Sequence, residues 1–280
     1  MTISELLGSS SVRLSEAGVE EPSREAATLL IYALNRDRSF LIAHPEYEPT
    51  NDEATRFDSF ITRRASREPF HYITGLKEFY GLDFAVTPDV LIPRPETEIL
   101  VEAAIKELQK LENPKFCEIG VGSGCISVSI LHHVPTTTAI GIDISEKALA
   151  VARRNADHHA VADRLSLQIG DVFAGVTEKF DMIVSNPPYI PDADLTTLQP
   201  EVRDHEPHLA LFSGSDGLDV LRRIVADAPK YLKPSGLLLM EIGFAQWNSV
   251  GELFNPSIWR AYEFLNDMQG IPRIVKASTL

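Results

Sequence analysis

The sequence predicts an α/β protein in which a small helical domain precedes a largely parallel sheet. From about residue 115, short apolar runs alternate with segments of helical periodicity, as in a sheet covered by helices on both faces. A glycine-rich turn follows the first of these runs, at the place where open α/β sheets bind ligands. The preceding 1–75 segment carries apolar residues at helical spacing.

The predicted helical domain covers residues 1–75. Apolar side chains recur at helical spacing over 6–17 and 26–34, and a third helix is predicted over 52–67. We expect Ser23 to cap the second helix, because a serine hydroxyl is a good acceptor for the first free backbone N–H groups. The domain shows no catalytic constellation, and we interpret it as a substrate-recognition domain.

A segment of different character connects this domain to the rest of the chain. Residues 79–86 alternate around Gly81, which predicts a hairpin. Pro93 and Pro95 then make a stiff turn before a helix predicted over 97–111. We therefore expect three parts: a helical domain at 1–75, a hairpin linker at 76–93 and a catalytic domain at 94–280.

The predicted catalytic domain alternates strands with helices. Strands are expected at 115–119, 138–142, 165–169, 180–185 and 236–241, and helices at 123–132, 145–157 and 217–232. Two further candidate strands, near 260–265 and 273–277, would close the sheet with an antiparallel pair.

The composition is that of a globular protein with an excess of acidic residues. The chain has 26 lysines and arginines against 40 aspartates and glutamates, a net charge of −14, and both predicted domains are negative. Direct nucleic-acid binding is therefore disfavoured, because duplex-binding proteins neutralise phosphates with clustered cations. The strongest cationic cluster, Arg63, Arg64 and Arg67, lies on a predicted helix. We expect it to be a solvated face, with a docking patch for an acidic partner as the alternative.

Other features predict a cytoplasmic protein without a metal. No apolar run approaches the roughly 18 residues of a membrane span, and the N-terminus lacks a signal pattern. Cys117 and Cys125 suggest small core residues and no disulfide framework. His205 and His208 have a metal-like spacing, but Pro207 interrupts the helix that would align them and no third ligand is apparent.

The glycine-rich turn has the pattern of a nucleotide-type cofactor site. Gly120, Gly122 and Gly124 lie between a strand and a helix, where the missing side chains let a ligand approach the backbone. The glycine spacing differs from that of the dinucleotide fingerprint. Glu118 precedes the turn, and Asp143 ends the next strand, where a carboxylate can accept hydrogen bonds from ribose hydroxyls.

A second motif, Asn186-Pro187-Pro188-Tyr189, follows the fourth predicted strand of the sheet. The side-chain oxygen of Asn186 and a backbone carbonyl near Pro187 can accept both hydrogens of an amide. Bonds out of the amide plane would reduce its conjugation and aim the nitrogen lone pair at a donor methyl. Consecutive prolines hold the loop rigid, and Tyr189 can stack on the planar group. Together the two motifs predict an N-methyltransferase.

Several segments then resemble one family, the protein-(glutamine-N5) methyltransferases that act on peptide chain release factors. The resemblance covers nearly the whole chain and is carried by residues 68–75, 79–81, 91–98, 118–124, 186–191, 206–207, 210–211 and 214–218. It implies a Rossmann-like class I methyltransferase sheet, S-adenosylmethionine as cofactor, and methylation of the glutamine in the Gly-Gly-Gln loop of a release factor.

The resemblance also implies roles for individual residues. The expected cofactor-binding residues are Glu118, Gly120, Val121, Gly122, Ser123, Gly124, Asp143, Asp171, Val172 and Asn186. The expected substrate-binding residues are Leu91, Ile92, Arg94, Asn186, Pro187, Pro188 and Tyr189, of which Asn186, Pro187 and Tyr189 are the catalytic ones. Glu118 stands where Asp is commoner, and Val172 stands where a larger residue packs on adenine.

Two other functions stay open at this point. A DNA adenine-N6 methyltransferase uses the same loop chemistry on a flipped base, although the acidic charge and the absence of a basic recognition domain disfavour it. A catalytically silent subunit that binds cofactor or protein is the alternative from another class, and an intact Asn186 loop disfavours that one. We expect a monomer whose partner is a release factor.

Overall fold

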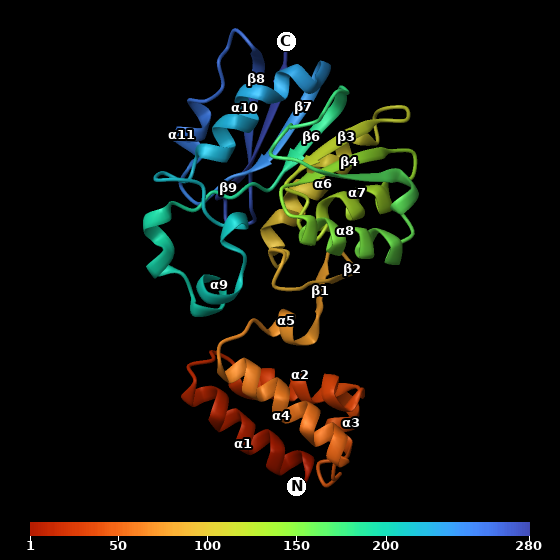
Figure 1. Cartoon of the computed structure of the whole chain (residues 1–280), viewed down its shortest axis with the longest axis vertical. Coiled ribbons are helices and arrows are strands. Elements are labelled where there is room, and N and C mark those ends of the chain that lie inside the picture. Colours follow the sequence, from red (N-terminus) through yellow and green to blue (C-terminus); the bar gives the residue numbers. More distant parts are fainter. The chain divides into compact units, whose positions relative to one another are not determined.

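The structure is a computed structural model that describes all residues from Met1 to Leu280. The chain forms two compact units. The smaller unit contains Met1–Leu76 together with Gln199–His205, and the larger unit contains Lys77–Leu198 and Glu206–Leu280. Figure 1 labels the elements of both units along the chain.

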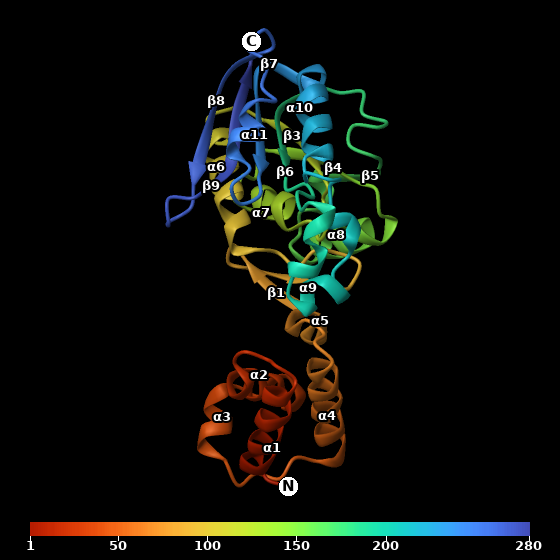
Figure 2. The same ribbon diagram turned by 90° about the vertical axis from the view of Figure 1, so that its left-hand side faces the viewer.

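The smaller unit is helical, as the sequence predicts. Its elements are α1 (Ile3–Glu16), α2 (Pro22–Leu34), α3 (Arg38–Ala43), α4 (Asn51–Ala65), α5 (Phe70–Thr74) and α9 (Pro200–His205). Helices α1, α2 and α4 lie side by side in Figures 1 and 2 around a core that includes Leu14, Leu29 and Phe57. Capping boxes at Thr2 and Thr50 begin α1 and α4, because each threonine accepts from the third backbone N–H of its helix.

The start of α2 differs from the prediction that Ser23 is its N-cap. Glu21 is the N-cap and Pro22 is the first helical residue, so Ser23 lies inside the first turn. Proline suits that place because its φ is already helical and its missing N–H would have no partner there.

The three clustered arginines do not form the solvated face that we expected from the sequence. Arg64 is only 5% exposed and forms ion pairs with Glu25 of α2 and, at 2.9 Å, with Glu201 of α9. Arg67 binds the same Glu201 through both carboxylate oxygens, at 2.8 and 2.7 Å. Arg63 pairs with Glu68. These charges are compensated within the helical unit, in part by a segment more than a hundred residues further along the chain.

The larger unit is built on a seven-stranded sheet with the order β5-β4-β3-β6-β7-β9-β8. Its strands are β3 (Lys115–Ile119), β4 (Thr138–Asp143), β5 (Leu165–Ile169), β6 (Phe180–Ser185), β7 (Leu232–Glu241), β8 (Trp259–Asn266) and β9 (Pro272–Thr279). Neighbours from β5 to β7 are parallel, and β9 pairs antiparallel with β7 and β8. The predicted parallel sheet and its antiparallel closing pair are confirmed.

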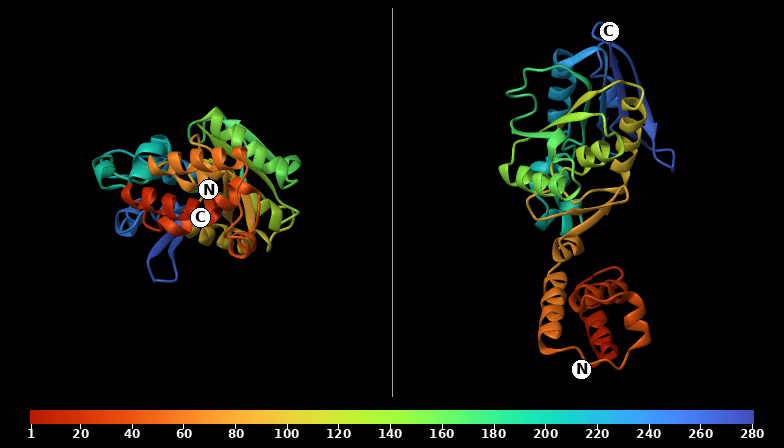
Figure 3. Two further views of the ribbon diagram at one scale, coloured as in Figure 1. Left: turned by 90° about the horizontal axis from the view of Figure 1, so that it is seen from below. Right: turned by 90° about the vertical axis from the view of Figure 1, so that its right-hand side faces the viewer.

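Helices cover both faces of this sheet. On one face, α6 (Glu98–Leu108), α7 (Cys125–His133) and α8 (Glu146–His158) pack on Phe116, Met182 and Leu239. On the other, α10 (Asp219–Tyr231) and α11 (Trp247–Gly251) pack on Ile183 and Met240. Figures 1 and 2 show these layers, and Figure 3 shows them from two further directions. Alternate residues of each strand therefore enter different cores.

The predicted hairpin is also present. It consists of β1 (Leu76–Phe79) and β2 (Leu82–Ala85), joined by Tyr80 and Gly81 at φ values of 53° and 74°. Positive φ at both central residues is what a type I′ two-residue hairpin turn requires. Buried Asn155 of α8 holds the hairpin to the glycine turn, because its side chain bonds both backbone groups of Ala85 and the carbonyl of Ser123.

Candidate active site

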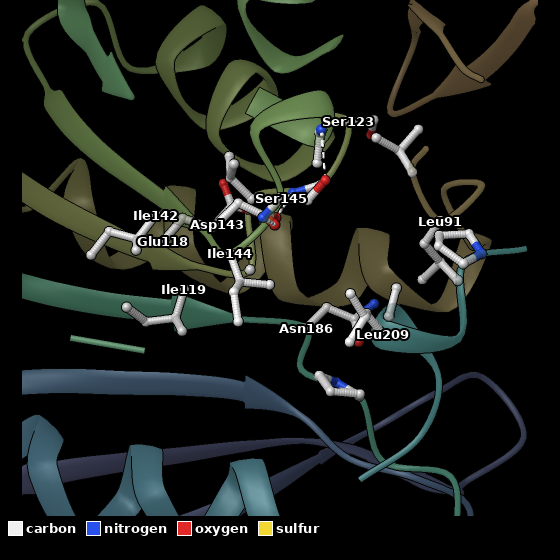
Figure 4. Close-up of a pocket in the computed structure, with 18 of the residues that line it drawn as sticks. Leu91, Glu118, Ile119, Ser123, Ile142, Asp143, Ile144, Ser145, Asn186 and Leu209 are labelled. Carbon is white, nitrogen blue, oxygen red and sulfur yellow. Dashed lines mark hydrogen bonds between the residues drawn. The ribbon is translucent and has the colours of Figure 1, made fainter. Parts of the chain in front are cut away.

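A cavity of about 350 Å³ lies within the larger unit, beyond the carboxyl ends of β3, β4 and β6. This edge is where open α/β sheets bind ligands, and the volume suits a cofactor-sized molecule. Figure 4 shows Glu118 and Asp143 on one side of the cavity and Asn186, Leu209 and Leu91 on the other. Most of the sequence-predicted site residues line it: Leu91, Arg94, Glu118, Gly120, Val121, Gly122, Ser123, Asp143, Asp171, Val172, Asn186 and Pro188.

The glycine turn connects β3 to α7 and forms part of the cavity wall. Gly120, Gly122 and Gly124 have φ values of 74°, 52° and 80°, which side-chain-bearing residues avoid. A Cβ on Gly122 would meet nothing within 4 Å, whereas a Cβ on Gly124 would lie 3.2 Å from that of Ala152 in α8. The first two glycines thus leave the backbone accessible, and Gly124, which does not line the cavity, allows close helix packing.

Glu118 is a fully buried carboxylate at the end of β3. It is 1% exposed, and its Oε2 accepts from the backbone N–H of Ser127 at 2.9 Å and from the Ser127 hydroxyl. Burial raises the pKa of Glu118 to about 8, against the opposing effect of the Ser127 hydrogen bonds. A buried carboxylate that lines a cavity can receive a cationic group. The positive charge would lower the pKa of Glu118 toward its ordinary value and so favour the ionised form.

This raised pKa predicts a pH-dependent affinity for the cofactor. We expect ionised Glu118 to pair with the ammonium of the cofactor, so affinity should rise as the pH increases toward about 8, where the ammonium itself begins to lose its proton. The stability of the free protein should change in the opposite direction. Because folding raises the pKa of Glu118, the free energy of unfolding should fall as the pH rises from the pKa of this carboxyl in the unfolded chain to about 8. Calorimetric titration with S-adenosylmethionine across this range should show the rise in the natural protein. A Glu118→Gln variant with the same pH dependence would contradict this role.

Asp143 ends β4 and is held by the glycine turn. One carboxylate oxygen accepts from the Gly122 N–H at 2.8 Å and the other from the Ser145 N–H at 2.9 Å. Burial raises the pKa of Asp143 although these hydrogen bonds oppose the shift. The carboxylate is therefore fixed in direction, and its remaining lone pairs can accept from hydroxyl groups of a ligand.

Asp171 and Val172 lie in the turn after β5. Asp171 is exposed and forms an ion pair with Arg223 of α10 at 2.8 Å. Val172 is buried and has a φ of 56°, which is rare for a β-branched residue. Such backbone strain persists where the surroundings hold it and is common at ligand sites. The cavity places both residues where the sequence predicts adenine contacts, and those contacts stay a prediction.

The Asn186 loop leaves the sheet directly after β6. The hydroxyl of Ser185 donates to the carbonyl of Ile119 at 2.7 Å, which holds this end of β6 to β3. Asn186 lines the cavity and donates from Nδ2 to Oγ1 of Thr97 at 3.1 Å. Pro187 is buried and Tyr189 is partly buried, and neither lines the cavity. The Tyr189 hydroxyl donates to Glu241 at 3.1 Å. The stacking of the Tyr189 ring on a substrate stays a prediction.

The turn before α6 closes another side of the cavity. Leu91 and Arg94 line it, whereas Ile92 is buried behind it. Buried Glu206 holds this turn in place, because it accepts from the Ile92 N–H at 3.2 Å and from the Arg94 guanidinium at 2.5 Å. Pro207, Leu209, Ala210 and Phe212, which follow Glu206, continue the wall.

Four polar residues that support the site are absent from the predicted site residues: Thr97, Ser127, Glu206 and Glu241. Glu241 is the last residue of a predicted strand whose carboxyl end lies at the ligand-binding edge of the sheet. That position alone could have indicated that Glu241 lies near the site. Thr97 begins a helix and reaches Glu241 across 144 positions of sequence, a pairing that local patterns do not encode.

Comparison with known proteins decides the family. The family model "PrmC N-terminal domain" matches residues 5–75, and "Methyltransferase small domain" matches residues 96–202. The release factor glutamine methyltransferase of Koribacter versatilis is 39% identical over 98% of each chain. That of Geobacter sulfurreducens is 44% identical over 94% of this chain and 91% of the relative.

The chain belongs to the release factor glutamine methyltransferase family. It is an S-adenosylmethionine-dependent methyltransferase. A solved methyltransferase from Pyrococcus furiosus shares its fold, with a TM-score of 0.53 at 16% identity over 78% of this chain and 98% of that one. The cavity fits this cofactor, because Glu118 can pair with its ammonium, Asp143 with its ribose, and the open backbone at Gly122 gives it room.

Proposed function

We propose that this methyltransferase modifies the side-chain amide nitrogen of the glutamine in the Gly-Gly-Gln motif of peptide chain release factors. The observation that carries the proposal is the placement of Asn186. It lies on the cavity wall at the end of β6, and its amino group is engaged by Thr97. Its side-chain oxygen is thereby left to accept a hydrogen bond from an incoming N–H group, which is what a carboxamide substrate offers.

The chain's own residues would prepare the substrate nitrogen for attack. Asn186 accepts one N–H, and a backbone carbonyl near Pro187 accepts the other, out of the amide plane. This weakens conjugation, and the nitrogen lone pair turns toward the cofactor. Bound S-adenosylmethionine supplies an electrophilic methyl group. The buried Pro187 and the Ser185–Ile119 hydrogen bond keep the loop from moving, so that catalysis rests on positioning.

Around this centre, we propose that Leu91, Pro188 and Arg94 contact the substrate glutamine and its flanking residues. The helical segment 1–75 would recognise the release factor, 76–93 would link it to the catalytic part, and one copy of the enzyme would act as a monomer in the cytoplasm. No helix is long and apolar enough to span a bilayer. The net charge of −14 supports a protein substrate over a nucleic-acid one.

A transfer assay tests this function directly. The enzyme is offered methyl-labelled S-adenosylmethionine with a release factor and with unmethylated DNA in parallel, and the labelled product is mapped by mass spectrometry. We expect label on the Gly-Gly-Gln glutamine and none on a release factor in which that glutamine is alanine. Label on adenine would instead favour a DNA adenine-N6 methyltransferase. Bound cofactor without transfer to either would favour a silent subunit.

A further inference from the structure

A chain of hydrogen bonds links the substrate-facing amide to a carboxylate buried behind the cavity. Asn186 donates from Nδ2 to Thr97 Oγ1 at 3.1 Å, and Thr97 donates to Glu241 Oε2 at 2.6 Å. The other oxygen of Glu241 accepts from the Tyr189 hydroxyl at 3.1 Å. Glu241 is 2% exposed and does not line the cavity, so it has no direct access to a substrate.

The direction of these hydrogen bonds follows from the chemistry of the side chains that form them. An ionised carboxylate only accepts hydrogen bonds, and a threonine hydroxyl has a single proton to donate. When Thr97 gives that proton to Glu241, its oxygen can only accept from Asn186. The Asn186 amino group must then face Thr97, and the amide oxygen must face away from it.

We propose that Glu241 is a positioning residue that fixes the orientation of the Asn186 amide through Thr97. The proposal deepens the proposed function and rests on it. If the Asn186 amide turned by half a rotation, its amino group would meet the N–H groups of the substrate, and donors would face donors. The amide is symmetric in shape, so packing alone does not choose between the two orientations; a hydrogen-bond partner of fixed polarity does.

The loop backbone is held independently of Glu241. Gln246 donates from Nε2 to the Tyr189 carbonyl at 2.9 Å and accepts from the Gly243 N–H at 2.9 Å. A Cβ on Gly217 would lie 2.2 Å from that same carbonyl, so the segments are in close contact. Glu241→Gln should therefore leave the loop in place but remove the fixed polarity, because an amide presents its oxygen to only one of Thr97 and Tyr189 and its amino group to the other.

The experiment compares Glu241→Gln, Thr97→Val and Thr97→Ser in the full-length enzyme, after transfer by the natural enzyme to a release factor has been established. We expect Glu241→Gln and Thr97→Val each to lower kcat by about 10- to 100-fold, as expected for a misplaced reacting group. Thr97→Ser keeps the hydroxyl and should retain most of kcat. In Glu241→Gln the Kd for S-adenosylmethionine should stay within about 2-fold, because Glu241, unlike Thr97, lies outside the cavity wall.

The double variant Glu241→Gln/Thr97→Val separates positioning from separate structural effects. If Glu241 acts through Thr97, the double variant should lose no more kcat than Thr97→Val alone. Losses that multiply, or an unchanged kcat in Glu241→Gln beside an impaired Thr97→Val, would overturn the proposal. A natural enzyme that does not methylate the release factor would instead refute the proposed function, before any variant is compared.

A pH profile adds a readout that a purely structural role would not change. Burial, with a smaller contribution from the charge of Glu96, raises the pKa of Glu241 to about 7, and Thr97, Tyr189 and Arg273 oppose the shift. Ionised Glu241 is the form that orients Thr97, so kcat at saturating cofactor should fall as the pH drops below about 7. The Glu241→Gln variant should lack this acidic limb, and its persistence there would contradict the proposal.

Discussion

Replacing Asn186 by alanine is expected to reduce methyl transfer by about 10²- to 10³-fold, as the loss of one preorganised hydrogen-bonding group at a reacting centre typically does. The variant removes the acceptor for the substrate N–H and also the donor to Thr97. It leaves Glu118 and Asp143 in place, so the Kd for S-adenosylmethionine should remain close to that of the natural enzyme. Single-turnover transfer and calorimetric binding measure the two effects separately.

Asn248→Ala is the matched control for this variant. Asn248 is an exposed asparagine on α11 that does not line the cavity, so its removal should change neither transfer nor cofactor binding. Transfer that survives in Asn186→Ala at the level of Asn248→Ala would exclude the assigned role. A loss of cofactor binding that matches the loss of transfer would show that Asn186 acts on the cofactor side of the site.

The sheet and most of the cavity wall follow from local sequence pattern. Parallel strands bring their carboxyl ends to one edge, so Glu118, Asp143 and Asn186, each at or just after a strand end, had to converge there. The strand predictions at 115–119 and 180–185 agree with β3 and β6, because short, largely apolar runs between turn signals are typical of buried parallel strands. The prediction at 165–169 agrees with β5, an edge strand in which apolar and polar residues alternate.

The contacts that orient these groups could not be predicted in this way. Thr97 meets Glu241 across 144 positions, and Arg64 meets Glu201 across 137. Both pairings depend on how distant segments pack, and neither partner stands in a recognisable spacing with the other. The arginine cluster was misinterpreted for this reason: helical periodicity shows which side chains share a face, but it does not show which segment covers that face.

The buried ion-pair network of the helical unit gives the second large expected effect. Replacing Arg64 by methionine should destabilise that unit by about 3 kcal/mol, because removing one partner of a buried pair leaves the other charge uncompensated. Arg64 is 5% exposed and serves both Glu25 and Glu201, whose side chains are 23% and 15% exposed. Arg67 would still pair with Glu201, so the carboxylate of Glu25 suffers most.

The measurement must report on the helical unit itself. Both tryptophans, Trp247 and Trp259, belong to the larger unit, so tryptophan fluorescence would not follow the unfolding of helices α2 and α4. Hydrogen exchange of the α2 and α4 amides reports local opening directly, and a loss of about 3 kcal/mol corresponds to exchange faster by roughly 100-fold or more. The amides of β3 and β6 serve as an internal reference and should not change.

Arg13→Met is the control, because it breaks an ion pair of the same type on the surface of the same unit. Arg13 and Asp58 are 44% and 74% exposed, and such pairs contribute at most about 1 kcal/mol.

Adding Glu25→Gln to Arg64→Met should recover part of the lost protection, since it removes the charge left without a partner. Equal exchange in Arg64→Met and Arg13→Met would mean that burial of this network adds nothing to stability. Recovery on adding Glu25→Gln would identify uncompensated charge, and not lost packing, as the source of the effect.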